Sequence, residues 1–151
     1  MAIPQGRIRQ EAIRWAVRAA MDSQSREDFK VLSTLSSPDF EVRPEPRLAA
    51  LLPGVVEDSG LLVGAEASVR FLEAWFEVFG RFQIEPMEAI DLGGGQVLVL
   101  NHLHGEGAAS GITLEGQEEA ELVTVRSGQV ARMEQWWSWQ EALNAVGWGN
   151  S

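Results

Sequence analysis

The spacing of hydrophobic positions changes at about residue 80. Before this point apolar side chains recur at helical spacing, which predicts a helix over residues 7–21, a second one that begins at Ser25, and a third over 65–79. After it they alternate with polar ones, as in strands with one buried face. This alternation predicts strands over 82–90, 97–104, 112–126 and 129–137, followed by a closing helix over 139–146. One short strand, over 40–43, is predicted before residue 80. Helices followed by antiparallel strands indicate an α+β fold with helices on one face of a sheet.

Two details refine this sheet. Pro86 cannot donate a hydrogen bond to a neighbouring strand, so its strand is predicted to lie at an edge or to carry a bulge. The segment 97–100 is apolar on both faces. One face can line the core, and we expect a second subunit to cover the other.

Composition limits the class of protein. A chain of 151 residues fits one domain, which we expect to span residues 1–151. The absence of cysteine excludes disulfides and thiolate chemistry and fits a cytoplasmic location. We see no secretory leader and no apolar run that could span a membrane. A formal net charge of −10, without a basic cluster, argues against nucleic-acid binding.

The order of several motifs resembles one family. They are Gly64 with the helix 65–79, Phe82-Gln-Ile-Glu-Pro, Gly95 to Gly105, Arg126-Ser-Gly-Gln-Val and Glu141-Ala-Leu-Asn-Ala-Val-Gly. Together they are similar to the SnoaL-like group of the nuclear-transport-factor-2-like (NTF2-like) superfamily, which includes polyketide cyclases. The resemblance implies a cone in which a curved antiparallel sheet wraps the N-terminal helices around an internal pocket. It also implies a homodimer formed through the convex sheet face.

The resemblance and the alternation of the strands together select side chains for the pocket. The pocket acid of the family corresponds to Gln135, so this residue should face inward with Met133 and Trp137. The same reasoning places Glu121 and Asn101 inside. On the strand 40–43 the isomerases carry their base just before a proline, which corresponds to Arg43. Two further tryptophans, Trp15 and Trp75, are candidates to line the pocket beside a flat ligand, and the alternative is that they fill the core.

This chain lacks residues that the resembled enzymes require for their reactions. The cyclases need an acid where this chain has Gln135, and an amide cannot shuttle protons. The epoxide hydrolases need an Arg and an Asp where this chain has Asn101 and Leu103. The isomerases need a tyrosine, and the chain contains none. Glu121 remains as the catalytic candidate, because burial would raise its pKa toward the working range. The alternative is a structural carboxylate that pairs with Arg43 or bonds to Gln135.

His102 and His104 lie two apart and should share the convex face. With a carboxylate they could bind a metal, but no third ligand has a telling spacing, so we predict no metal and no cofactor.

Two functions stay open. The chain could be an isomerase or cyclase that acts on a small apolar molecule of aromatic, polyketide or terpenoid type, without a cofactor. Alternatively, it could be a non-catalytic ligand-binding or dimerisation module, which the amide at position 135 favours.

Overall fold

The structure is a computed structural model that describes residues 36–50, 60–78, 81–106 and 113–148. Its strands form a six-stranded mixed sheet in the order β2-β1-β6-β5-β4-β3. The elements are β1 (Ser36–Arg43), α3 (Pro46–Ala49), β2 (Leu62–Val63), α4 (Ala65–Val78), β3 (Arg81–Gly93), β4 (Gln96–Glu106), β5 (Thr113–Arg126), β6 (Gln129–Trp136) and α5 (Trp139–Ala145). The α+β class expected from the sequence is confirmed.

The sheet is not wholly antiparallel, which corrects one expectation. Strands β3 to β6 form an antiparallel meander, but β1 pairs in parallel with β6, with Val42 opposite Met133. Side-chain alternation along one strand shows which residues share a face, but it carries no information on the direction of a partner strand. The parallel pairing brings the segment after β1 beside the end of β6.

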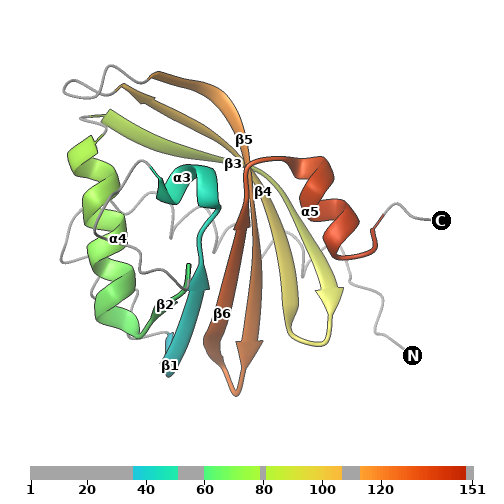
Figure 1. Cartoon of the computed structure of the whole chain (residues 1–151). Helices are drawn as coiled ribbons and strands as arrows, with labels where there is room; N and C mark the ends of the chain where they lie inside the picture. The colour runs from blue at the N-terminus through green and yellow to red at the C-terminus, as the bar shows by residue number, and fades with distance from the viewer. Residues whose placement is uncertain (1–35, 51–59, 79–80, 107–112, 149–151) are drawn as a thin grey trace.

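The edge position predicted for the strand containing Pro86 is confirmed. β3 is the last strand in the described order, and its pairing with β4 shifts register between Pro86 and Glu88. A second shift, between Leu103 and His104, interrupts the pairing of β4 with β5. Such irregularities bend strands, and Figure 1 shows β3, β4 and β5 turning sharply at mid-length. Helices α3 and α4 lie on one side of this bend, and α5 lies on the other.

Helix α5 covers the sheet face that was expected to need a second subunit. Leu98, Leu100 and Ala120 form a buried cluster with Ala142 of this helix. Trp139, Leu143 and Val146 pack against the same cluster. The helix begins at Ser138, whose side chain accepts a hydrogen bond from the backbone N–H of Glu141. The described helices therefore lie on both faces of the sheet, not on one.

Two sequence expectations fall outside the described residues. They are the helix over 7–21 with Trp15 and the helix that begins at Ser25. The internal cone around these helices stays a prediction. No helix among the described residues is long and apolar enough to cross a membrane.

Candidate functional site: a buried acid cluster

One face of the sheet carries a cluster of buried polar side chains. Strand register places Val99 opposite Glu121 and Glu121 opposite Gln135, while Asn101 lies opposite Glu119. Directly opposed residues in a sheet point to the same side. We call this side the acid face. The other side, covered by α5, is the α5 face.

Glu119 is the centre of the acid cluster. Its side chain is only 1% exposed. Asn101 Nδ2 donates a hydrogen bond to Glu119 Oε1 at 2.7 Å, and Gln135 Nε2 donates one to Glu119 Oε2 at 2.8 Å. The pKa of Glu119 is raised, because its burial outweighs the lowering effect of the hydrogen bonds from Glu121, Asn101 and Gln135. Both oxygens of Glu119 thus have amide donors, which suit an ionised carboxylate.

Glu121 is the protonated partner of this pair. Its side chain is 7% exposed and shares a hydrogen bond with Glu119. Burial raises the pKa of Glu121 well above 4.5, and the charge of Glu119 and the shared hydrogen bond raise it further. Two buried carboxyl groups in contact cannot both ionise at low cost, so one proton is shared between them. The amide donors hold the charge on Glu119, and the proton therefore resides on Glu121.

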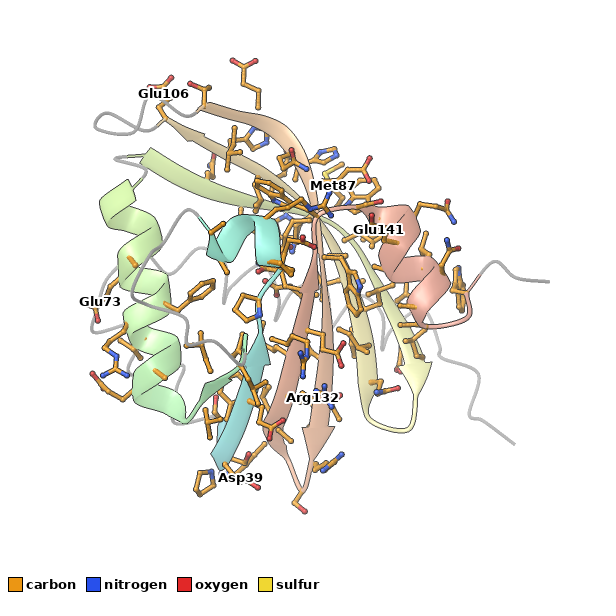
Figure 2. The ribbon with its side chains drawn as sticks, in the orientation of Figure 1. Asp39, Glu73, Met87, Glu106, Arg132 and Glu141 are labelled. Carbon is orange, nitrogen blue, oxygen red and sulfur yellow. The ribbon has the colours of Figure 1, made fainter. Side chains whose placement is uncertain are left out.

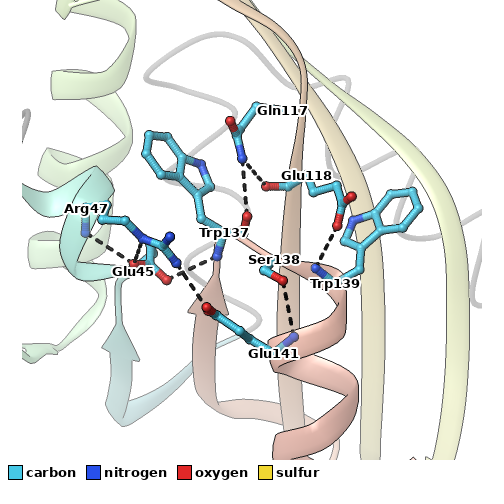
Figure 3. A network of polar contacts seen from close by, with 8 residues as sticks. All are labelled: Glu45, Arg47, Gln117, Glu118, Trp137, Ser138, Trp139 and Glu141. Atoms are coloured by element: carbon cyan, nitrogen blue, oxygen red, sulfur yellow. Dashed lines mark hydrogen bonds and ion pairs between the residues drawn. The ribbon is translucent and has the colours of Figure 1, made fainter. Parts of the chain in front are cut away.

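The segment after β1 closes the cluster from the side of α3. The backbone N–H of Glu45 donates to Gln135 Oε1 at 3.1 Å, which fixes the orientation of the Gln135 amide. The Glu45 carboxylate accepts hydrogen bonds from Arg47 Nε at 2.7 Å and from the Trp137 backbone N–H at 3.1 Å. Burial alone would raise the pKa of Glu45, but these bonds and the charge of Arg47 lower it below 4.5. Figure 3 shows this network with Arg47 reaching Glu141 of α5, at 3.2 Å.

Three buried polar atoms near the cluster have no hydrogen-bond partner among the described residues. Asn101 Oδ1 and Glu121 Oε2 are acceptors, and Trp137 Nε1 is a donor. Buried polar atoms without partners are uncommon in folded proteins, and they gather at functional sites. The Trp137 ring also lies near Arg47, with 6.0 Å between the ring centroid and Arg47 Cζ.

Arg43 does not belong to this cluster, which corrects the sequence interpretation. It is exposed, and it pairs in register with Glu134 on the α5 face. The last residue of β1 has the opposite parity to Val42, whose register partner Met133 lies on the acid face. Arg43 therefore cannot pair with Glu121, and the hydrogen bond expected between Glu121 and Gln135 is replaced by bonds from both to Glu119.

The other predicted site residues are placed as follows. Asn101, Met133 and Gln135 share the acid face with Glu121, as the alternation predicted. Trp137, directly after β6, contacts the α3 side through its ring. Trp75 lies in α4, which contacts β1, β2 and β3. Trp15 lies outside the described residues.

His102 and His104 lie on the α5 face, as predicted. His104 Nε2 is 3.3 Å from Glu85 Oε1, and the His102 ring stacks on Trp139 with 4.8 Å between ring centroids. Within the described ranges, no group of three or more His, Asp or Glu side chains is arranged to hold a metal ion.

Sequence reasoning missed Glu119 and Glu45. Glu119 shares the parity of Glu121 two residues earlier, so the alternation already contained this signal. Glu45 follows Pro44 outside any strand, and no periodic pattern could orient it. Its burial depends on the parallel pairing of β1 with β6.

Comparison with known proteins supports the fold. No family model matches the sequence, and no curated protein matches it. Many solved structures match. An NTF2-like protein of unknown function from Burkholderia pseudomallei is 15% identical, with a TM-score of 0.64 over 86% of this chain and 93% of that one. TerC, co-crystallised with polyporic acid, is 20% identical, with a TM-score of 0.64 over 87% and 95%. A SnoaL-like polyketide cyclase from Jannaschia, so described without proof of activity, is 18% identical, with a TM-score of 0.59 over 91% and 92%. The chain therefore has the NTF2-like fold, and the resemblance to SnoaL-like proteins is confirmed at the level of the fold.

Proposed function

We propose that this chain binds a small apolar molecule on the acid face and that Glu121 exchanges a proton with it, without a cofactor. The supporting observation is the buried Glu119–Glu121 pair, in which two carboxyl groups share a hydrogen bond and burial raises the pKa of Glu121 well above 4.5. A carboxyl whose pKa is raised in this way holds its proton to higher pH than an exposed one and can pass it to a ligand, as a general acid or base must.

The parts of the cluster have distinct roles in this proposal. Glu121 is the group that exchanges the proton. Glu119 is a positioning residue, because its negative charge keeps Glu121 protonated before a ligand binds. Asn101 and Gln135 hold Glu119 ionised through their amide N–H groups. Gln135 therefore takes part as a hydrogen-bond donor. An acid at position 135, as in the resembled cyclases, would instead compete with Glu119 for the same proton.

The walls of the site are part of the proposal as well. Val99, Met133 and Trp137 offer apolar surface around the pair. We propose that Trp15 and Trp75 add to it, and that the ligand is aromatic, polyketide-like or terpenoid-like. TerC, a structural neighbour, was co-crystallised with polyporic acid. That compound is one sensible probe for this chain. A cytoplasmic homodimer is the accompanying proposal for its assembly.

A ligand screen followed by isotope exchange tests this function. Thermal-shift measurements with aromatic, polyketide-like and terpenoid compounds, including polyporic acid, should identify ligands that raise the Tm. Carbonyl-containing ligands are then incubated with the protein in D2O. Proton exchange at the carbon beside the carbonyl, followed by NMR, should be faster with the wild-type chain than without it.

Matched variants separate catalysis from folding. Glu121→Gln keeps the shape and a hydrogen-bond donor toward Glu119 but cannot exchange a proton, so it should abolish the exchange while the protein remains folded. Glu115→Gln changes an exposed glutamate of the same strand and should leave the exchange unchanged. Ligand binding with no exchange above background would favour the second candidate function, a non-catalytic ligand-binding module. The observation in its favour is that position 135 carries an amide, which cannot titrate and whose two ends are both hydrogen-bonded, to Glu119 and to the Glu45 N–H.

A further inference from the structure

We infer that the ligand of the acid face carries a protonated amino group, which binds between Asn101 Oδ1 and Glu121 Oε2. The inference rests on the binding part of the proposed function and names the head group of the ligand. It follows from a buried carboxyl pair that no described cation contacts, and from two buried acceptors that have no donor among the described residues.

The first step is the charge of the pair. Both oxygens of Glu119 accept hydrogen bonds from neutral amides, so no cation neutralises them through these contacts. Three described arginines near the sheet are directed elsewhere. Arg132, which is labelled in Figure 2, and Arg43 are on the α5 face. Arg132 Nη2 lies 3.0 Å from Glu134 Oε1, and Arg47 is bonded to Glu45 and Glu141. A buried carboxylate without a counter-ion favours a cationic ligand over a neutral one, and it repels an anion.

The second step is the pair of acceptors. Asn101 is fully buried, and its Nδ2 is committed to Glu119, so its Oδ1 is directed away from that bond and is left without a donor. Glu121 Oε2 is also buried, and no group in the described part of the chain donates to it. A primary ammonium group offers three N–H donors and can serve both acceptors. A hydroxyl offers one donor, and a carboxylate offers none.

The third step links ligand binding to proton release. A cation within hydrogen-bond distance favours the ionised form of a carboxyl group. On binding, Glu121 should therefore lose its proton to solvent, and the ammonium should become the partner of the resulting carboxylate. Glu121 would then be in the ionised form that a general base requires. The ligand itself would convert this residue from acid to base.

Matched sets of three analogues test the inference on the full chain. Each set shares one aromatic body, phenyl, naphthyl or indolyl, and ends in an ethylamine, an ethanol or a propanoate group. Isothermal titration calorimetry at pH 7 in two buffers of different ionisation enthalpy gives the affinity and the number of protons released. We expect the amine of at least one set to bind at least about tenfold more tightly than its alcohol, a difference of about 1.4 kcal/mol. The propanoate should not bind, and the amine should release up to one proton per site.

Variants and outcomes complete the test. Glu121→Gln should remove the proton release and weaken the amine about tenfold or more, while Glu115→Gln should change neither quantity. Equal binding of alcohol and amine, or tighter binding of the propanoate, would overturn the amine inference and leave the binding proposal standing. Amine binding that is unchanged in Glu121→Gln would place the amine elsewhere and also overturn the inference. If no member of any set binds, both the inference and the proposed binding of aromatic molecules at this site fail.

Discussion

Gln135 Nε2 donates a hydrogen bond to Glu119 Oε2 at 2.8 Å, and both partners lie on the face opposite α5. The side chain that stands in place of a family acid thus stabilises a different acid on the neighbouring strand. This relationship decides what substitutions in the cluster should do.

Replacing Gln135 by glutamate should destabilise the fold, and more strongly at high pH. The new carboxyl removes a donor from Glu119 and adds a third acid to a buried pair. Loss of a hydrogen bond to a buried charge costs about 1–3 kcal/mol. Urea unfolding of Gln135→Glu at pH 5.5 and pH 8 should show a loss of about that size or more, larger at pH 8. An equal loss at both pH values would mean that the third carboxyl does not titrate with the pair.

Replacing Glu121 by glutamine should flatten the dependence of stability on pH. The folded pKa of Glu121 lies well above its ordinary value of 4.5. An acid with a raised folded pKa stabilises the fold most below its unfolded pKa, and this contribution is lost as pH rises toward the folded pKa. The free energy of unfolding of the wild type should therefore fall between about pH 4.5 and the folded pKa, by about 1.4 kcal/mol per unit of pKa shift. The Tm should fall over the same pH range.

The control for that measurement is the neighbouring carboxyl. Glu119→Gln should be much more destabilising than Glu121→Gln, because its amide group would face the donors of Asn101 and Gln135. Parallel pH profiles of the Tm for wild type and Glu121→Gln would show that Glu121 titrates normally.

Replacing Glu45 by glutamine should destabilise the protein above about pH 4.5. The folded pKa of Glu45 is lowered, so its contribution is present above the ordinary carboxyl pKa and is lost as pH falls through the folded pKa. Chemical unfolding of Glu45→Gln and wild type should differ at pH 7 and converge in acid. The nearby variant Glu41→Gln, on the α5 face of β1, should show no such convergence. A difference between Glu45→Gln and wild type that persists unchanged in acid would contradict an ionised Glu45.

Replacing Gly95 by alanine should be costly, unlike the same change at Gly94. Both glycines have positive φ, at +81° and +63°, and therefore share the conformational penalty of a side chain in the left-handed region. Only at Gly95 would a Cβ atom lie 2.5 Å from the backbone oxygen of Val125, so a strand must shift. We expect the Tm of Gly95→Ala to fall clearly below that of Gly94→Ala. Equal values would show that the β4–β5 pairing yields without cost.

Much of the fold could be predicted from alternation and turn residues. The strands containing Asn101, Glu121 and Gln135 were assigned with the correct parity, because one buried face enforces a period of two. The bulge at Pro86 followed from its missing N–H. The parallel pairing of β1 and the position of α5 depend on contacts between segments distant in sequence, which local patterns do not encode. Arg43 was assigned to the pocket from its resemblance to the position of the isomerase base, whereas the pairing of β1 with β6 places it on the α5 face.

The candidate site was predicted in part. Glu121 was selected as a lone base, whereas the structure places it in a coupled pair with Glu119. The spacing places Glu119 and Glu121 on one face, but like charges usually stay apart, so the spacing alone gives no reason to propose that the two carboxyl groups contact each other. The stability of this pair depends on Asn101 and Gln135 from two other strands, and this requires the assembled sheet.

The hydrogen bond between the Glu45 N–H and Gln135 joins residues 90 positions apart. The Glu119–Glu121 pair and its two amides lie instead on consecutive strands of one meander. Closing the 90-residue loop between Glu45 and Gln135 costs about 4 kcal/mol of chain entropy. Contacts between neighbouring segments generally form first. The acid pair should thus be assembled before β1 docks, and Glu45 should complete it late in folding. An acid cluster that is built early and closed late would make the refolding rate, as well as the stability, depend on pH.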